Sequence, residues 1–124
     1  MDRTALEDLL APARPFAIRR MFGGHGVFDG DAMIALEAAG TVYLKADAQS
    51  VPLFEEKGCE VFSYGTRKGE SRFIGTYRRL PEEAFDDPDV MREWFALARA
   101  AAARIAARRA TPPAKRRRPQ ATSG

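Results

Sequence analysis

The stretch VFDGDAMIALEAAGTVYLKA, residues 27–46, decides the fold because it holds three short apolar segments divided by two turns. The first turn is Asp29-Gly30-Asp31 and the second is Ala39-Gly40. Short runs of aliphatic, β-branched and aromatic residues with glycine-containing turns between them are typical of antiparallel strands. The stretch therefore predicts a β-meander, in which each strand pairs with the next one along the chain.

The segments on either side extend this sheet. Residues 15–22 (PFAIRRMF) are predicted to be extended, and Gly23-Gly24-His25-Gly26 after them predicts a bulge or a tight connection between strands. Residues 59–64 (CEVFSY) and 72–79 (RFIGTYRR) predict two further strands, joined by a polar loop at 65–71. The sheet is therefore expected to combine strands from both halves of the chain.

Two short helices are predicted around these strands. Residues 4–10 (TALEDLL) indicate the first helix, which the prolines that follow bring to an end. The second is expected to end at Gly58, because glycine is favoured just beyond a helix C-terminus. Asp47 and Ser50 can both cap its start, and Pro52 favours Ser50 because proline fits only the first helical turn.

A longer third helix is predicted at the end of the domain. It begins at Asp87-Pro88, an N-cap followed by proline at the first helical position, and continues to about Arg109. Apolar residues recur along it at helical spacing and predict a stripe that packs on the sheet. The stripe consists of Val90, Trp94, Leu97, Ala98, Ala101 and Ile105.

The order of these elements predicts an α+β fold. We expect two layers, an antiparallel β-sheet with helices on one face, in the order α-β-meander-α-ββ-α. A chain of 124 residues is long enough for one hydrophobic core, which we assign to a domain at residues 1–109. Residues 110–124 contain prolines and small polar residues without apolar periodicity, so they are predicted to form a disordered basic tail.

Charge is distributed unevenly along the chain, whose net charge is +3. Residues 108–124 contain six bases and no acid, which leaves 14 bases and 17 acids in residues 1–107, a net charge of −3. The domain's bulk charge therefore gives no support to nucleic-acid binding. Cys59 is the only cysteine, which favours a reducing compartment, and no segment approaches the ~18 apolar residues of a membrane span. We expect a soluble cytoplasmic protein.

Candidate catalytic groups are few. His25 and Cys59 could form a nucleophile–base pair, but a small buried hydrophobe is the more usual role of a cysteine in an apolar strand. The glycines around His25 could cradle a phosphate, yet they lack the lysine and the following helix that phosphate loops require. Asp29 and Asp31 have too few neighbouring oxygen ligands for a calcium loop, and one cysteine with one histidine cannot complete a zinc site.

Two groups of bases could contact nucleic acid. Arg19-Arg20 and Arg78-Arg79 could lie on the sheet, where Tyr64, Phe73 and Tyr77 would supply stacking surfaces. A solvated sheet face is the stronger explanation of these arginines. The run Lys115-Arg116-Arg117-Arg118 is the better electrostatic site, because clustered bases attract phosphates whatever the base sequence.

Several segments, taken in order, resemble the N-terminal domain of the TfoX/Sxy family. They are RRMFGGHGVF (19–28), MIAL (33–36), VYLKAD (42–47), LPEE (80–83) and an Asp-Pro-led helix with Glu93-Trp94. The resemblance implies a compact α+β domain without catalytic residues. It also implies a role in regulating natural competence, together with a cAMP-receptor-type transcription activator. Family members carry a second helical domain at their C-terminus, where this chain has the basic tail.

We therefore expect a non-enzymatic regulatory or interaction domain that works through protein contacts, and the resemblance implies that its partner is the transcription machinery or a regulator. Weak nucleic-acid contact is expected from Lys115, Arg116, Arg117 and Arg118. The alternative is a small enzyme or ligand-binding domain that uses the glycine-rich turn, and a concave pocket of polar groups near His25 would distinguish it. No cofactor, metal or membrane contact is expected, and the oligomeric state is open, a homodimer included.

Overall fold

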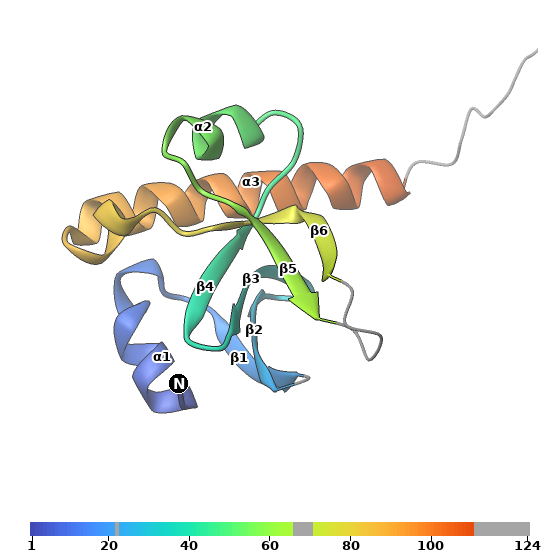
Figure 1. The fold of residues 1–124 in the computed structure, drawn as a ribbon. Helices are drawn as coiled ribbons and strands as arrows, with labels where there is room; N and C mark the ends of the chain where they lie inside the picture. Colours follow the sequence, from blue (N-terminus) through green and yellow to red (C-terminus); the bar gives the residue numbers. More distant parts are fainter. Residues whose placement is uncertain (22, 66–70, 111–124) are drawn as a thin grey trace, which may run out of the picture.

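The computed structural model describes residues 1–21, 23–65 and 71–110. The strands found there form a single antiparallel sheet in the order β1-β2-β3-β4-β6-β5 (Figure 1). Their bounds are β1 (Ala17–Met21), β2 (Gly24–Asp29), β3 (Ala32–Ala38), β4 (Thr41–Lys45), β5 (Val61–Gly65) and β6 (Ser71–Arg79). The predicted β-meander is β2 to β4, and the predicted two-strand unit is β5 with β6. Strand β6 joins the two groups by pairing with β4.

Helical segments pack on this sheet. They are α1 (Arg3–Leu9), α2 (Val51–Glu56), α3 (Pro88–Ala110) and two short 3-10 helices, η1 (Ala11–Ala13) and η2 (Glu82–Phe85). The long helix α3 crosses the sheet and contacts β3, β4, η1 and η2 (Figure 1). These elements confirm the predicted α+β class.

Local sequence signals set the ends of the helices. At the start of α3, the Asp87 carboxylate accepts a hydrogen bond from the Asp89 amide at 2.9 Å, as an N-cap does. At the end of α2, Gly58 has a φ of +71°, and the Cys59 amide donates to the Phe54 carbonyl. This is a Schellman motif, which glycine favours because it adopts positive φ without strain.

The start of α2 differs from expectation in its side-chain capping. Ser50 immediately precedes α2, as predicted, but its hydroxyl makes no capping hydrogen bond to the helix. Instead the hydroxyl accepts a hydrogen bond from the Asp47 amide at 3.0 Å, and the Asp47 carboxylate accepts one from the Ser50 amide at 3.2 Å. These reciprocal bonds have the pattern of a capping box with Asp47 in the capping position, so Asp47 and not the favoured Ser50 caps the turn that leads into α2.

The glycine-rich segment is also more regular than predicted. Gly24, His25 and Gly26 are paired residues of β2, so the tight connection falls earlier, between Met21 and Gly24. The bulge lies later, between Val27 and Phe28, opposite an extra residue of β3. Similarly, β5 begins at Val61, so Cys59 lies in the link before the strand and does not open it.

One hydrophobic core unites the sheet and the helices. Leu6 of α1, Phe54 of α2 and Phe95 of α3 are fully buried in it with Val27 and Leu44 of the sheet. The predicted stripe of α3 contributes Trp94, Ala98 and Ala101, all buried, while its other members are half-buried. Met91 and Phe95 are buried beside the stripe, because α3 is covered by the sheet and by both 3-10 helices.

Candidate functional site

His25 lies on β2 and is held by an acidic partner. Its Nδ1 is 2.7 Å from the Oε1 of Glu37, its cross-strand neighbour on β3, and both side chains are buried. The other carboxylate oxygen of Glu37 accepts a hydrogen bond from the Gly40 amide at 2.8 Å. Burial by itself would raise the pKa of Glu37, but the hydrogen bonds from His25 and Gly40 outweigh it and lower that pKa. The pair ties the β3–β4 turn to β2.

The structure does not bring His25 and Cys59 together. Cys59 precedes β5, and four strand spacings separate β2 from β5 in the sheet, about 19 Å at the usual strand separation. Burial raises the pKa of the Cys59 thiol, which disfavours the thiolate that a nucleophile needs. The two side chains therefore do not form a nucleophile–base pair in this conformation.

The glycines beside His25 are required by packing. A Cβ atom on Gly24 would lie 2.0 Å from the Glu37 carbonyl oxygen on the neighbouring strand. A Cβ atom on Gly26 would lie 2.5 Å from the Met21 sulfur and 2.9 Å from the Met33 sulfur. Both glycines sit within paired strand and precede no helix, so they do not form a phosphate cradle.

The Asp-Gly-Asp segment forms the turn between β2 and β3, as its composition predicts. Asp29 pairs with Arg99 of α3 at 2.8 Å, and Arg99 also donates to the carbonyls of Ala13 and Pro15. Among the described residues, no three His, Cys, Asp or Glu side chains are arranged to hold a metal ion. Asp29 therefore fastens α3 to the sheet.

The four arginines considered for nucleic-acid contact do not form one surface. Arg19 and Arg20 are on β1, whereas Arg78 and Arg79 are on β6, with three strands between them. Arg78 is paired with Glu55, and Arg79 with Glu60 at 2.8 Å. The sheet arginines are thus separated, and half of them are neutralised by carboxylates. The side chains of Tyr64 and Phe73 lie outside the described part of the structure.

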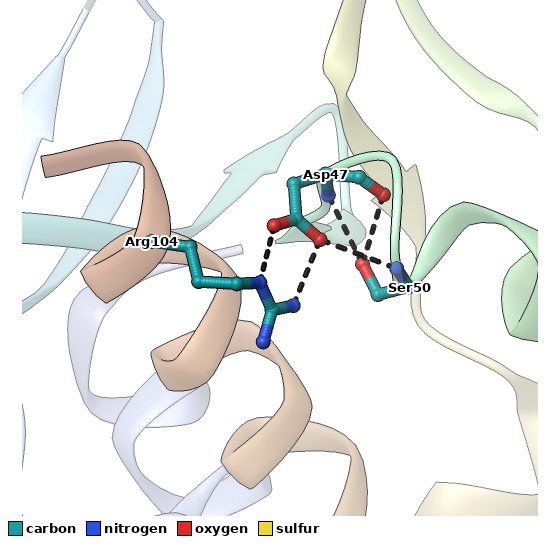
Figure 2. Close-up of polar contacts among 3 residues, drawn as sticks. All are labelled: Asp47, Ser50 and Arg104. Atoms are coloured by element: carbon teal, nitrogen blue, oxygen red, sulfur yellow. Dashed lines mark hydrogen bonds and ion pairs between the residues drawn. The ribbon is translucent and has the colours of Figure 1, made fainter. Parts of the chain in front are cut away.

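A buried polar cluster joins α3 to the connection between β4 and α2 (Figure 2). Arg104 donates from Nε and Nη2 to the two carboxylate oxygens of Asp47, at 2.6 and 2.8 Å. The hydrogen bonds from Arg104 hold the pKa of Asp47 far below its usual range. Burial by itself would raise this pKa, and the hydrogen bond from the Ser50 amide lowers it further. The Asp47 side chain is only 3% exposed, so this bidentate pair neutralises a buried carboxylate.

Lys45 lies two residues before Asp47 and faces a different environment. Its Nζ is 4.4 Å from the centroid of the Tyr77 ring, on the neighbouring strand β6. Burial lowers the pKa of Lys45, and the positive charge of Arg109 in α3 lowers it further. Sequence patterning could not single out Lys45, because its neighbours come from separate elements.

An open hollow of about 140 Å³ lies beside the β3–β4 turn. Its lining includes Val42, Arg79 and Leu80, with Glu82 and the 39%-exposed Phe85 of η2. His25 does not line it, and the volume is below the roughly 300–1,000 Å³ typical of small-molecule pockets. This hollow is therefore not the concave polar pocket at His25 that the ligand-binding alternative needs.

Two sequence expectations concern other parts of the chain. The basic run Lys115, Arg116, Arg117 and Arg118 lies outside the described residues, so its nucleic-acid contact stays a prediction. In the part of the chain that the structure describes, no helix combines the length and apolarity needed to cross a membrane.

Comparison with known proteins identifies the family. The model of the TfoX N-terminal domain matches residues 8–102, which include the sheet and most of α3. The chain belongs to the TfoX N-terminal domain family. It is also 43% identical over 49 residues to a protein of Aliivibrio fischeri strain ES114 named DNA transformation protein TfoX1. That match covers 40% of this chain and 23% of the longer relative.

Proposed function

We propose that this TfoX N-terminal domain is a non-enzymatic regulator of DNA uptake that works through contact with a protein of the transcription machinery. Family membership carries the proposal, and the similarity to a protein named for DNA transformation supports it. The separation of His25 from Cys59 and the engagement of His25 with Glu37 favour regulation over catalysis. The basic tail would add weak attraction to nucleic acid in the cytoplasm.

A genetic experiment tests the regulatory role. Deleting the gene in its native cell should lower both the transformation frequency and the transcript levels of DNA-uptake genes. A plasmid copy of the wild-type chain should restore both. Unchanged transformation and transcription in the deletion strain, under conditions where the protein is expressed, would contradict the proposal.

The hollow beside η2 is a candidate surface for the contact with a protein partner. Phe85 is a large apolar side chain open to solvent, and Arg79 and Glu82 beside it give the surface a polar rim. Affinity capture with the full chain should recover a transcription regulator, and Phe85→Ser should weaken that capture. Leu53→Ser is the matched control, because Leu53 is 42% exposed on α2 and does not line the hollow.

The enzyme alternative is tested in the same strain. His25→Gln and Cys59→Ala should both restore transformation, because neither side chain is expected to take part in chemistry. Circular dichroism must first establish that both variants fold, since both residues are buried. A hydrolase or transferase activity of the purified chain that both folded variants lose would overturn the non-enzymatic assignment.

A further inference from the structure

Three bases flank the contact between α3 and the end of β4, where Arg104 pairs with Asp47; Figure 1 shows α3 crossing the sheet. Lys45 is the last residue of β4, and its cross-strand partner is Tyr77 of β6. Arg108 and Arg109 occupy the last turn of α3. The positive charge of Arg109 acts on both Lys45 and Tyr77. Burial is the main cause of the lowered pKa of Lys45, and Arg109 lowers that pKa further. For Tyr77, burial raises the pKa and Arg109 partly offsets this rise.

These three bases have no carboxylate partner in the part of the chain that the structure describes. One turn earlier in α3, Arg104 is neutralised by Asp47, and most other described arginines are paired in a similar way. Lys45 is half-buried, so its charge has lost part of its hydration without gaining a counter-ion. An anion bound here would offset both the desolvation of Lys45 and its repulsion by Arg109.

Tyr77 provides a second, independent observation. Tyr77 is 4% exposed, and its buried hydroxyl has no hydrogen-bond partner among the described residues. Burial raises the pKa of Tyr77 to about 12, so the hydroxyl stays protonated and remains a donor. A buried donor without an acceptor is unusual in a native fold, and an anion oxygen would supply the acceptor.

The opposite end of α3 carries the opposite charge. Six exposed carboxylates lie around its start, Glu82, Glu83, Asp86, Asp87, Asp89 and Glu93, and in the described part of the chain only three of them are paired with bases, Glu82 with Arg79, Glu83 with Lys57 and Asp89 with Arg92. The helix has 23 residues, so its two ends are about 34 Å apart at the usual rise. A long polyanion would therefore be attracted to one end of the domain and repelled by the other, which fixes its orientation.

We propose that Lys45, Arg108 and Arg109 form a docking surface for the phosphate backbone of duplex DNA, next to Tyr77. The surface belongs to the folded domain and is distinct from residues 115–118. It does not depend on the proposed protein contact, which uses other residues. Binding through it is independent of base sequence, because phosphate contacts fix position without reading bases.

The test measures the DNA affinity of the full chain as a function of salt concentration. A labelled duplex of about 30 base pairs is titrated by fluorescence anisotropy between about 50 and 200 mM salt. The triple variant Lys45→Gln, Arg108→Gln, Arg109→Gln should reduce the log–log salt slope by about 0.9 for each phosphate that the variant no longer neutralises. At about 0.1 M salt, the removal of each such phosphate interaction should weaken binding roughly eightfold.

A matched control removes the same charge elsewhere. Arg3→Gln, Lys57→Gln and Arg92→Gln together also remove three bases, each of which is exposed and paired with a carboxylate. This triple variant should leave the slope unchanged. An unchanged slope in the first triple variant, or an equal reduction in the control, would overturn the proposal. The proposal would also be overturned if the wild-type chain did not bind DNA but bound a polyglutamate peptide, and if that binding were lost when Lys45 was replaced. The anion that docks here would then belong to a protein.

Tyr77→Phe gives a separate readout because it removes a donor and no charge. In the free protein it should raise the midpoint of urea unfolding, since it removes an unsatisfied buried hydroxyl. It should also weaken DNA binding at every salt concentration without changing the slope. If Tyr77→Phe is more stable than the wild type but binds DNA equally tightly, the Tyr77 hydroxyl takes no part in DNA binding.

Discussion

Arg104 and Asp47 are 57 positions apart in the sequence, and their side chains form the bidentate ion pair that fastens α3 to the end of β4 (Figure 2). Arg104 lies one turn before Arg108, and Asp47 lies two residues after Lys45. The pair therefore fixes the end of α3 against the strand that carries Lys45. Because the Asp47 carboxylate neutralises Arg104, Arg104 does not add to the positive charge of Lys45, Arg108 and Arg109.

Replacing Asp47 by asparagine should destabilise the domain at neutral pH. The wild-type carboxylate has a pKa held below its unfolded value by Arg104, so its ionised form stabilises the folded state. That contribution is complete above the unfolded pKa of about 4 and is lost as the pH falls toward the folded value. The difference in urea midpoint between wild type and Asp47→Asn should therefore be largest near neutrality and shrink below about pH 4.

Asp31→Asn is the control for this pH dependence. Asp31 is exposed in the β2–β3 turn, where an asparagine is equally acceptable. This variant should unfold like the wild type across the same pH range. A pH-independent gap between wild type and Asp47→Asn would mean that packing, and not the ionised carboxylate, accounts for the destabilisation.

Trp94→Ala should lower the free energy of unfolding by about 3–5 kcal/mol. Trp94 is 6% exposed, its ring lies 4.9 Å from that of Phe54, and its indole N–H donates to Glu83 at 3.1 Å. The exposed neighbour Glu93 gives the control, since Glu93→Ala should change stability by less than about 0.5 kcal/mol. Urea denaturation measures both. A decrease under about 1 kcal/mol for Trp94→Ala would place this side chain outside the core.

Local signals in the sequence predicted most chain turns and helix ends, with the side-chain cap of α2 as the exception. Asp29-Gly30-Asp31, Gly58 and Asp87-Pro88 act within four or five residues, so their effects can be inferred without knowing the rest of the fold. The glycine-rich segment around His25 was predicted less well. Its glycines are constrained by Glu37 and Met33 on the neighbouring strand, and no local pattern indicates that contact.

The proposed docking surface at Lys45, Arg108 and Arg109 depends on contacts between residues that are distant in the sequence. Strand β6 pairs with β4 across an intervening helix and strand, which places Tyr77 beside Lys45. The bases of α3 are evident in the sequence, but no pattern there indicates that Lys45 lies near them. Conversely, the sequence suggested a patch of Arg19-Arg20 with Arg78-Arg79, which the sheet order separates. Strand order and ion pairing are long-range properties, and spacing along the chain does not determine them.

The two glycines of β2 should differ in their tolerance of alanine. A Cβ at Gly24 would meet a backbone carbonyl at 2.0 Å, which can move only if the strand pair opens. At Gly26 the clash is with the flexible ends of methionine side chains and with Phe28, so repacking should limit the destabilisation to about 1–3 kcal/mol. Gly75→Ala is the control, because none of the described atoms lies within 4 Å of its Cβ position.

Urea unfolding of the three alanine variants should therefore rank Gly24 as the most damaging, Gly26 next and Gly75 last. If Gly24→Ala is tolerated as well as Gly75→Ala, β2 and β3 are not paired closely at that point. The packing explanation for the glycine-rich segment would then be wrong.

Neutralising the basic run should weaken DNA binding in a salt-dependent way. Lys115, Arg116, Arg117 and Arg118 can each release a counter-ion from a phosphate. Replacing all four with glutamine should reduce the log–log salt slope by up to about 3.6, at about 0.9 per phosphate neutralised. The measurement is the same anisotropy titration, with two duplexes of different sequence. Affinity for both duplexes should fall equally, because phosphate contacts carry no sequence information.

The basic run and the surface at the end of α3 make separable contributions to this binding. Suppose that both surfaces contact the same duplex. The fourfold glutamine variant at 115–118 and the triple variant of Lys45, Arg108 and Arg109 should then each reduce the salt slope, and the two reductions should add in a variant that combines them. Unchanged affinity in the run variant would leave the folded domain as the sole binding surface. An unchanged unfolding midpoint is expected for the run variant, since the family match ends at residue 102 and the core residues all precede the run. A lowered midpoint there would show that residues 115–118 contact the fold, and would contradict their assignment as a DNA-contacting tail.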